Sequence, residues 1–75
     1  MFNDYLYSFR AVIDYYRYLN DKDIDTRVYY ANCALMHLRN FILYAYYDNM
    51  SVATKYYSAF KVCVGKVVCN SFNNK

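Results

Sequence analysis

The chain has 75 residues, a net charge of +3 and a hydrophobic fraction of 59%, to which twelve Tyr contribute. This is enough apolar material for one small folded domain, residues 1–75, and too much for a disordered tail. Charged residues interrupt every apolar run before the roughly 18 residues that a membrane span needs, so we expect no contact with the inside of a membrane.

Breaks in secondary structure are few. Gly65 is the single glycine and proline is absent, and tight turns rely on these two residues. The polar runs at 20–25 and 48–51 separate three segments of helical length. We therefore predict an all-α fold, an antiparallel up-down-up three-helix bundle. Its helices cover about residues 3–19, 26–47 and 52–69, and a frayed tail follows at 70–75.

The first predicted helix is amphipathic, with an N-cap at Asn3 or Asp4. Its core face carries Phe2, Leu6, Phe9, Ile13 and Tyr16. The other side combines Tyr with charged residues, and Tyr and Arg are frequent in protein–protein interfaces. We predict that a protein partner binds this other side, through Tyr7, Arg10, Asp14, Tyr15, Arg17 and Tyr18.

The second predicted helix follows an N-cap at Asp25 and is apolar around most of its circumference. One seam is the expected intramolecular core: Val28, Ala31, Leu35, Leu38, Ile42 and Ala45. A second seam lies on a different side of the same helix: Tyr29, Cys33, Met36, Asn40, Leu43 and Tyr47. The far flank of this second seam holds Tyr30, Ala34 and Phe41.

Two apolar seams on one helix exceed what two neighbouring helices normally cover. We therefore predict that the second seam is the interface of a homodimer, in which Asn40 fixes the register. The alternative is a complete monomer, in which the first and third helices cover both seams.

The third predicted helix follows a cap at Asn49 or Ser51. Its core face carries Tyr56, Phe60, Cys63 and Val67, with Ala53 and Val64 beside them. The β-branched run 62–68 around Gly65 also permits a hairpin, but the helical spacing continues through Gly65 and favours a helix.

The lysines of this helix offer an alternative function. Lys55, Lys61 and Lys66 could contact nucleic-acid phosphates. The outward face of the helix has no Arg, Asn or Gln for base contacts, so such binding would be nonspecific.

Few side chains in the sequence could support catalysis. Cys33 and His37 are one helical turn apart and could form a nucleophile pair or hold a metal ion. The other two thiols, Cys63 and Cys69, are expected on different sides, so we predict no catalytic residues, no metal site and no cofactor. Three cysteines and no export leader predict free thiols in the cytoplasm, which is the host cytoplasm if the protein is viral.

Together these features predict a small non-enzymatic protein–protein interaction module. Its Tyr, Asn and Lys content is typical of an AT-rich gene. Its size is compatible with a viral or phage accessory protein that binds and inhibits a host factor.

Overall fold

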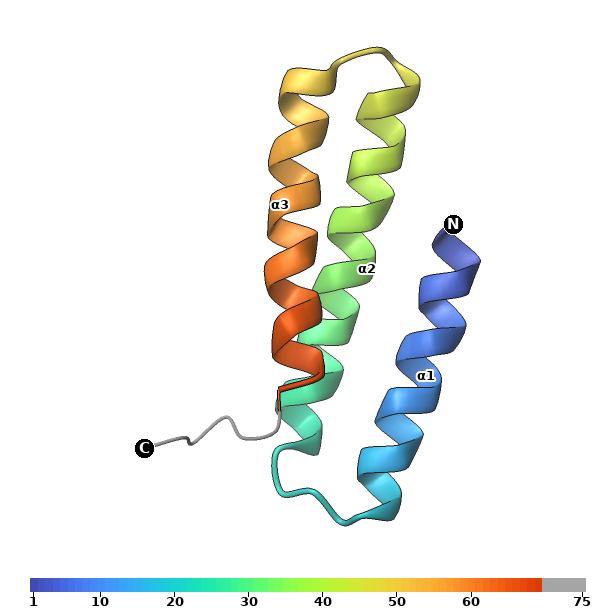
Figure 1. Cartoon of the computed structure of the whole chain (residues 1–75), viewed down its shortest axis with the longest axis vertical. Helices are drawn as coiled ribbons and strands as arrows, with labels where there is room; N and C mark the ends of the chain where they lie inside the picture. Colours follow the sequence, from blue (N-terminus) through green and yellow to red (C-terminus); the bar gives the residue numbers. More distant parts are fainter. Residues whose placement is uncertain (70–75) are drawn as a thin grey trace.

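The computed structural model describes residues 1–69, which form three helices: α1 (Phe2–Tyr18), α2 (Ile24–Tyr46) and α3 (Met50–Val67) (Figure 1). The helices run up, down and up, and α2 packs mostly against α3 and less against α1. The predicted all-α fold with three packed helices is confirmed. The tail predicted at 70–75 lies outside the described residues, and dimerisation stays a prediction.

All three helices begin and end one or two residues earlier than predicted. The N-cap of α1 is Met1 instead of Asn3 or Asp4, and that of α2 is Asp23 instead of Asp25. These predictions were wrong because acidic residues also favour the first turn of a helix, where the helix dipole is positive. The N-cap of α3 is Asn49, whose side-chain oxygen accepts a hydrogen bond from the Val52 N–H at 3.4 Å.

Both loops reverse the chain with the same backbone motif. Asn20 and Asp48 have φ angles of 58° and 61°, in the left-handed region that glycine usually occupies. In each loop, the N–H of this residue and that of the next donate to carbonyls in the last turn of the preceding helix, at 2.9–3.1 Å. This arrangement is the Schellman motif. Asn and Asp therefore end α1 and α2 in place of glycine.

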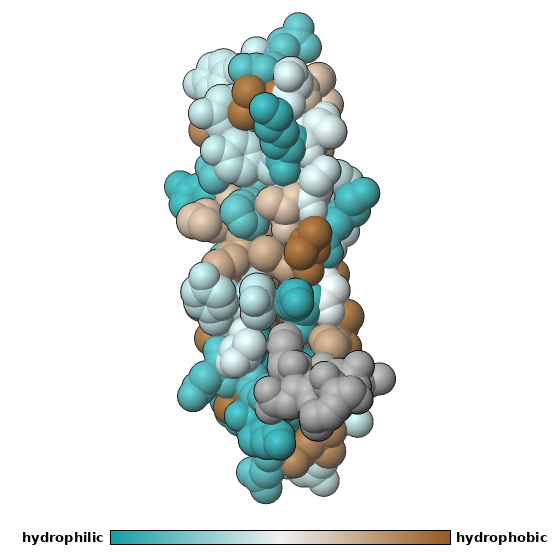
Figure 2. Space-filling model, turned by 90° about the vertical axis from the view of Figure 1, so that its left-hand side faces the viewer, coloured by the Kyte–Doolittle hydropathy of each residue, from teal (hydrophilic) through white to brown (hydrophobic). Residues whose placement is uncertain are grey.

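The third helix continues through residues 62–67, so the alternative of a hairpin is wrong. Gly65 is exposed and lies inside the helix, where a Cβ atom would meet nothing within 4 Å. The molecule seen from the α3 side shows hydrophilic and hydrophobic side chains interspersed (Figure 2). The face of α3 in this view is therefore of mixed polarity.

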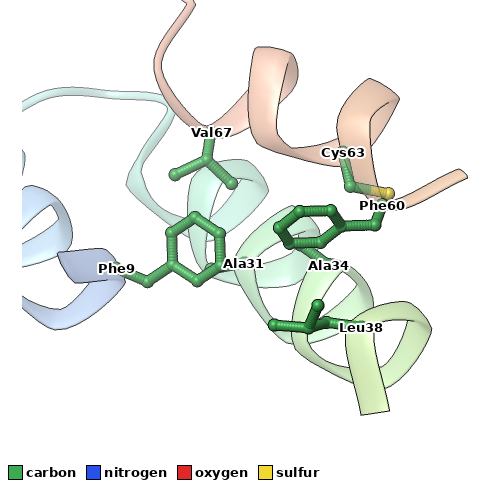
Figure 3. Packing of buried hydrophobic residues seen from close by; sticks show 7 residues of the cluster. All are labelled: Phe9, Ala31, Ala34, Leu38, Phe60, Cys63 and Val67. Atoms are coloured by element: carbon green, nitrogen blue, oxygen red, sulfur yellow. The ribbon is translucent and has the colours of Figure 1, made fainter. Parts of the chain in front are cut away.

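The buried core joins all three helices (Figure 3). It consists of Phe9 from α1, Ala31, Ala34 and Leu38 from α2, and Phe60, Cys63 and Val67 from α3. The core faces predicted for the first and third helices are confirmed, because Phe9, Ile13, Phe60, Cys63 and Val67 are all buried.

The core face predicted for the second helix needs correction. Ala34, predicted on the flank of the other seam, is fully buried, whereas Ile42, predicted in the core, is 37% exposed. The physical reason is the position of the two neighbours. Contact with α3 buries the side of α2 that carries Ala34. The shorter α1 begins beside Ile42, because Phe2 and Ile42 line the same hollow, and α1 leaves the end of α2 uncovered (Figure 1).

Small residues allow α2 and α3 to approach closely. Ala34 on α2 and Ala53 on α3 are both fully buried. Beyond them, aromatic rings pack in pairs: Phe41 with Tyr57, centroids 5.0 Å apart, and Tyr44 stacked on Tyr56 at 5.5 Å. Such pairs add stability beyond the area they bury. This interface therefore extends along most of α3.

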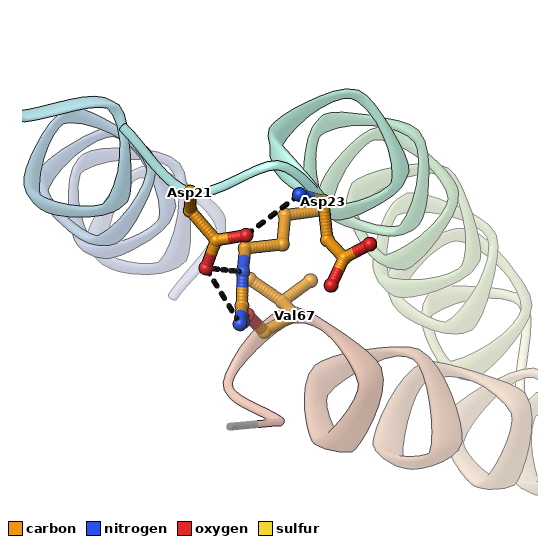
Figure 4. Close-up of polar contacts among 4 residues, drawn as sticks. Asp21, Asp23 and Val67 are labelled. Atoms are coloured by element: carbon orange, nitrogen blue, oxygen red, sulfur yellow. Dashed lines mark hydrogen bonds and ion pairs between the residues drawn. The ribbon is translucent and has the colours of Figure 1, made fainter. Parts of the chain in front are cut away.

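Arg27 is a buried cation that links three parts of the fold (Figure 4). Its guanidinium lies 3.1 Å from the Asp21 carboxylate in the first loop, and its Nη1 donates to the Val67 carbonyl at 2.7 Å. The guanidinium carbon also lies 3.6 Å from the ring centroid of Tyr16. Arg27 therefore connects the end of α1, the start of α2 and the end of α3. The sequence offered no sign of this role, because Arg27 resembles any charged residue near a helix start.

Candidate interaction surfaces

The second seam of α2 faces solvent over much of its length. Tyr29, Met36, Leu43 and Tyr47 are 61%, 53%, 47% and 67% exposed, and we call these four the α2 stripe. Cys33 and Asn40, predicted in the same seam, are half-buried at its edge, and Cys33 packs against the core. Neither α1 nor α3 covers the stripe, so the alternative in which both seams are covered within one chain does not hold.

The apolar surface widens toward the end of α2. Ile42 and Tyr46 are also exposed there, and a hollow of about 380 Å³ is lined by Arg39, Asn40, Ile42, Leu43 and Tyr46. The first residue of α1, Phe2, borders this region at Arg39 and Ile42, and α2 continues past the start of α1 (Figure 1). Leu43 belongs both to the stripe and to the lining of the hollow, so the two adjoin toward the end of the helix.

The thiols of α2 and α3 influence one another. Burial raises the pKa of the Cys63 thiol, and the nearby Cys33 raises it further. Cys33 packs against the buried cluster that contains Cys63, so the two thiols lie near one another. Because the thiolate is the reactive form of cysteine, a raised pKa makes Cys63 a poor nucleophile.

Tyr29, at the start of the stripe, interacts with the Cys33 thiol. A side-chain hydrogen bond with Cys33 and the charge of that thiol raise the pKa of the Tyr29 hydroxyl. The phenol therefore stays neutral at physiological pH, which suits a residue in an interface without charges.

His37 faces α3 instead of a site with other metal ligands. It is half-buried, with its ring centroid 6.3 Å from that of Tyr56. Its Nδ1 atom is buried without a hydrogen-bond partner among the residues that the structure describes. Within residues 1–69, no group of three or more His, Cys, Asp or Glu side chains could hold a metal ion.

The six residues predicted for partner binding on α1 are all exposed, but they do not form one face. Arg10, Asp14 and Arg17 line a groove between α1 and α2. Tyr7 and Tyr18 are not part of its lining, but they lie only about 20° and 40° around the helix from Asp14. Tyr15 lies about 140° around the helix from Arg10 and packs edge-on against Tyr16 at 5.5 Å. The predicted surface is therefore divided, and its three charged residues belong together.

The α1–α2 groove has a volume of about 330 Å³. Its apolar floor consists of Leu6, Phe9, Ile13, Val28, Ala31 and Leu35, and its rim of Arg10, Asp14, Arg17 and Asn32. A volume above about 300 Å³ is in the range of ligand-binding clefts. The sequence signal for this rim was the placement of Arg10, Asp14 and Arg17 at positions i, i+4 and i+7. The groove itself depends on the spacing between two helices, which no local pattern gives.

The lysines of the alternative function are exposed, but they do not converge. Lys55 and Lys66 lie on the outward face of α3, while the Lys61 ammonium lies 5.3 Å from the ring centroid of Tyr57. Nucleic-acid binding through these three residues stays a prediction.

No match to a known protein assigns a role to these surfaces. No helix among the described residues is long and apolar enough to cross a membrane. No protein-family model matches the chain, and neither a curated protein nor a solved structure matches it.

Proposed function

We propose that this protein is a non-enzymatic protein–protein interaction module that self-associates through the α2 stripe. The observation that carries the proposal is the exposure of Tyr29, Met36, Leu43 and Tyr47 along the length of the longest helix and at its C-cap. Monomeric proteins rarely expose large contiguous apolar patches, and those they do expose commonly mark interfaces.

A second copy of the chain is the occupant that fits this surface. The stripe contains no charged residue, so two copies can face each other across a two-fold axis without repulsion between like charges. Arg39, in the lining of the adjoining hollow, is the charged residue beside this surface.

The exposed area is also of the required size. A tyrosine side chain can bury about 150–250 Å², so the exposed parts of Tyr29, Tyr46 and Tyr47 alone offer on the order of 300–500 Å². Met36, Leu43 and Ile42 bring the total toward the roughly 800 Å² that each partner contributes to a standard interface. Burial of this face would also help a domain that is marginally stable alone.

Sedimentation equilibrium tests the proposal. We expect the wild-type protein to sediment at twice its chain mass of 9.1 kDa, and the Met36→Glu/Leu43→Glu variant to sediment as a monomer. Circular dichroism should show that this variant keeps its helices, because both side chains are about half exposed and lie outside the buried core of the single chain.

Ser58→Glu/Val62→Glu is the matched control, since it adds two carboxylates to an exposed face of α3. The control should keep the dimer mass. A monomeric wild-type protein would rule out self-association. Loss of helix in the Met36→Glu/Leu43→Glu variant would place those residues in the core of the monomer and also overturn the proposal.

A further inference from the structure

We infer that the α1–α2 groove is a docking site for one amphipathic helix of a partner protein, a helix that carries two carboxylates seven residues apart. This inference rests on the proposed interaction function, but it concerns a different surface from the α2 stripe. It names the chemistry of the partner that binds the charged residues of α1.

The shape of the groove suits a helix. Its floor is apolar, and it is bounded by two helices, an arrangement that receives the apolar residues at positions i, i+3 or i+4, and i+7 of a partner helix. The floor reaches from Val28 to Leu35 on α2, and a further hollow of about 250 Å³ follows at Phe2, Arg39 and Ile42. Along the axis of α2, the distance from residue 28 to residue 42 is about 21 Å, which corresponds to about four helical turns.

The rim supplies the charge pattern. Arg10 and Arg17 are two turns apart on α1, about 10.5 Å along the helix axis, and Asp14 lies between them. None of these three side chains makes an ion pair or hydrogen bond in the part of the chain that the structure describes. Two exposed guanidinium groups without partners, beside an apolar floor, are suited to bidentate carboxylate contacts from an incoming chain.

The complementary partner has a defined pattern. The rim has the order positive, negative, positive, so a helix alongside α1 should present Glu at i, Lys at i+3 or i+4, and Glu at i+7. A second copy of this chain does not supply that pattern from its described helices. In α1, Asp4 and Asp14 are ten residues apart, and α2 carries Asp25 alone. A partner protein is therefore the occupant that the charges favour.

Two designed peptides test the inference. Both are lactam-bridged 18-residue helices with the same Leu face. One carries Glu, Lys and Glu at i, i+4 and i+7 of its flank, and the other carries Lys, Glu and Lys. Fluorescence anisotropy with the Met36→Glu/Leu43→Glu variant, in which the stripe is blocked, should show about tenfold tighter binding of the first peptide at low salt. NMR shift changes should centre on Leu6, Ile13 and Leu35.

Two double variants separate the site from general charge effects. Arg10→Glu/Arg17→Glu and Lys55→Glu/Lys66→Glu each lower the net charge by four, because each replaces two cations by two carboxylates. The arginine variant should reverse the peptide preference, whereas the lysine variant on α3 should keep it.

Three results would overturn the inference: equal binding of the two peptides, equal effects of the two double variants, or shift changes centred away from the groove. Dodecanoate that binds as tightly as the peptide, with the same shift changes, would assign the groove to a lipid-like carboxylate instead. A wild-type protein that proves monomeric leaves these measurements interpretable, because they do not depend on self-association. If the Met36→Glu/Leu43→Glu variant loses its helices, the same measurements are made on the wild-type protein.

Discussion

The two sides of α2 are built in different ways. Toward α3, buried alanines and paired aromatic rings fill the contact along much of the helix. Toward α1, the contact is shorter and leaves a groove of about 330 Å³ with exposed arginines on its rim. Buried contact without voids stabilises the fold, whereas surface that remains accessible can bind another molecule. The comparison therefore assigns stability mainly to α2–α3 and recognition to the side of α1.

Of the substitutions considered, Arg27→Met should have the largest effect on stability. The substitution leaves the Asp21 carboxylate, which is 16% exposed, without its cation, and removes a donor from the Val67 carbonyl. We expect the free energy of unfolding to fall by about 3–5 kcal/mol, the usual cost of breaking a buried ion pair, as measured by urea denaturation.

Arg39→Met is the matched control for Arg27→Met, because Arg39 is an exposed arginine on the same helix. Its effect should stay within about 0.5 kcal/mol. Equal effects of the two substitutions would show that Arg27 does not connect the helices as described.

Ala34→Leu tests how closely α2 and α3 pack. Ala34 is fully buried, so the larger side chain should overpack the contact and lower the free energy of unfolding by about 1–3 kcal/mol. Asn32→Leu places the same side chain at the rim of the α1–α2 groove, where there is space, and should be close to neutral. If Asn32→Leu destabilised the fold as much as Ala34→Leu, the two sides of α2 would be packed alike.

Asp48→Gly should stabilise the protein. Asp48 has a φ of 61° at the end of α2, a conformation that glycine adopts without strain. We expect a gain of about 0.5–1 kcal/mol in thermal or urea unfolding. Asp48→Ala, which has a Cβ atom and no polar side chain, should instead lose stability, and a gain from alanine would contradict the left-handed turn.

The smallest expected effect concerns the reactivity of the Cys63 thiol, which is measured as its rate of alkylation. Burial raises the pKa of its thiol, and each unit of pKa lowers the thiolate fraction at pH 8 about tenfold. In the folded protein, iodoacetamide should therefore modify Cys63 more slowly than Cys33 and Cys69, which are half-buried. Mass spectrometry of timed samples measures the three rates, and similar rates would contradict the burial of Cys63.

The same shift predicts a dependence of stability on pH. Because the folded state binds the Cys63 proton more tightly than the unfolded state does, this contribution is complete below the ordinary pKa of 9.0. It is lost as the pH rises through the raised value. The Cys63→Ala variant should lose less stability than the wild type above pH 9.

Local sequence patterns were sufficient to predict the three helices and the inward faces of the outer two. These features rest on a periodicity of 3.6 residues, which places Phe9, Phe60 and Val67 on the inner faces of their helices without knowledge of any neighbour. The same periodicity identified the α2 stripe, because a helix that is apolar on most sides must leave some of that surface uncovered by two neighbours.

Tertiary packing determined the remaining features: which side of α2 is most deeply buried, why Ala34 replaces Ile42 there, and that Arg27 is a buried cation. Packing also brought Arg10, Asp14 and Arg17 to the rim of a groove. These features depend on the distances and lengths of neighbouring helices, and residues far apart in the chain set those distances.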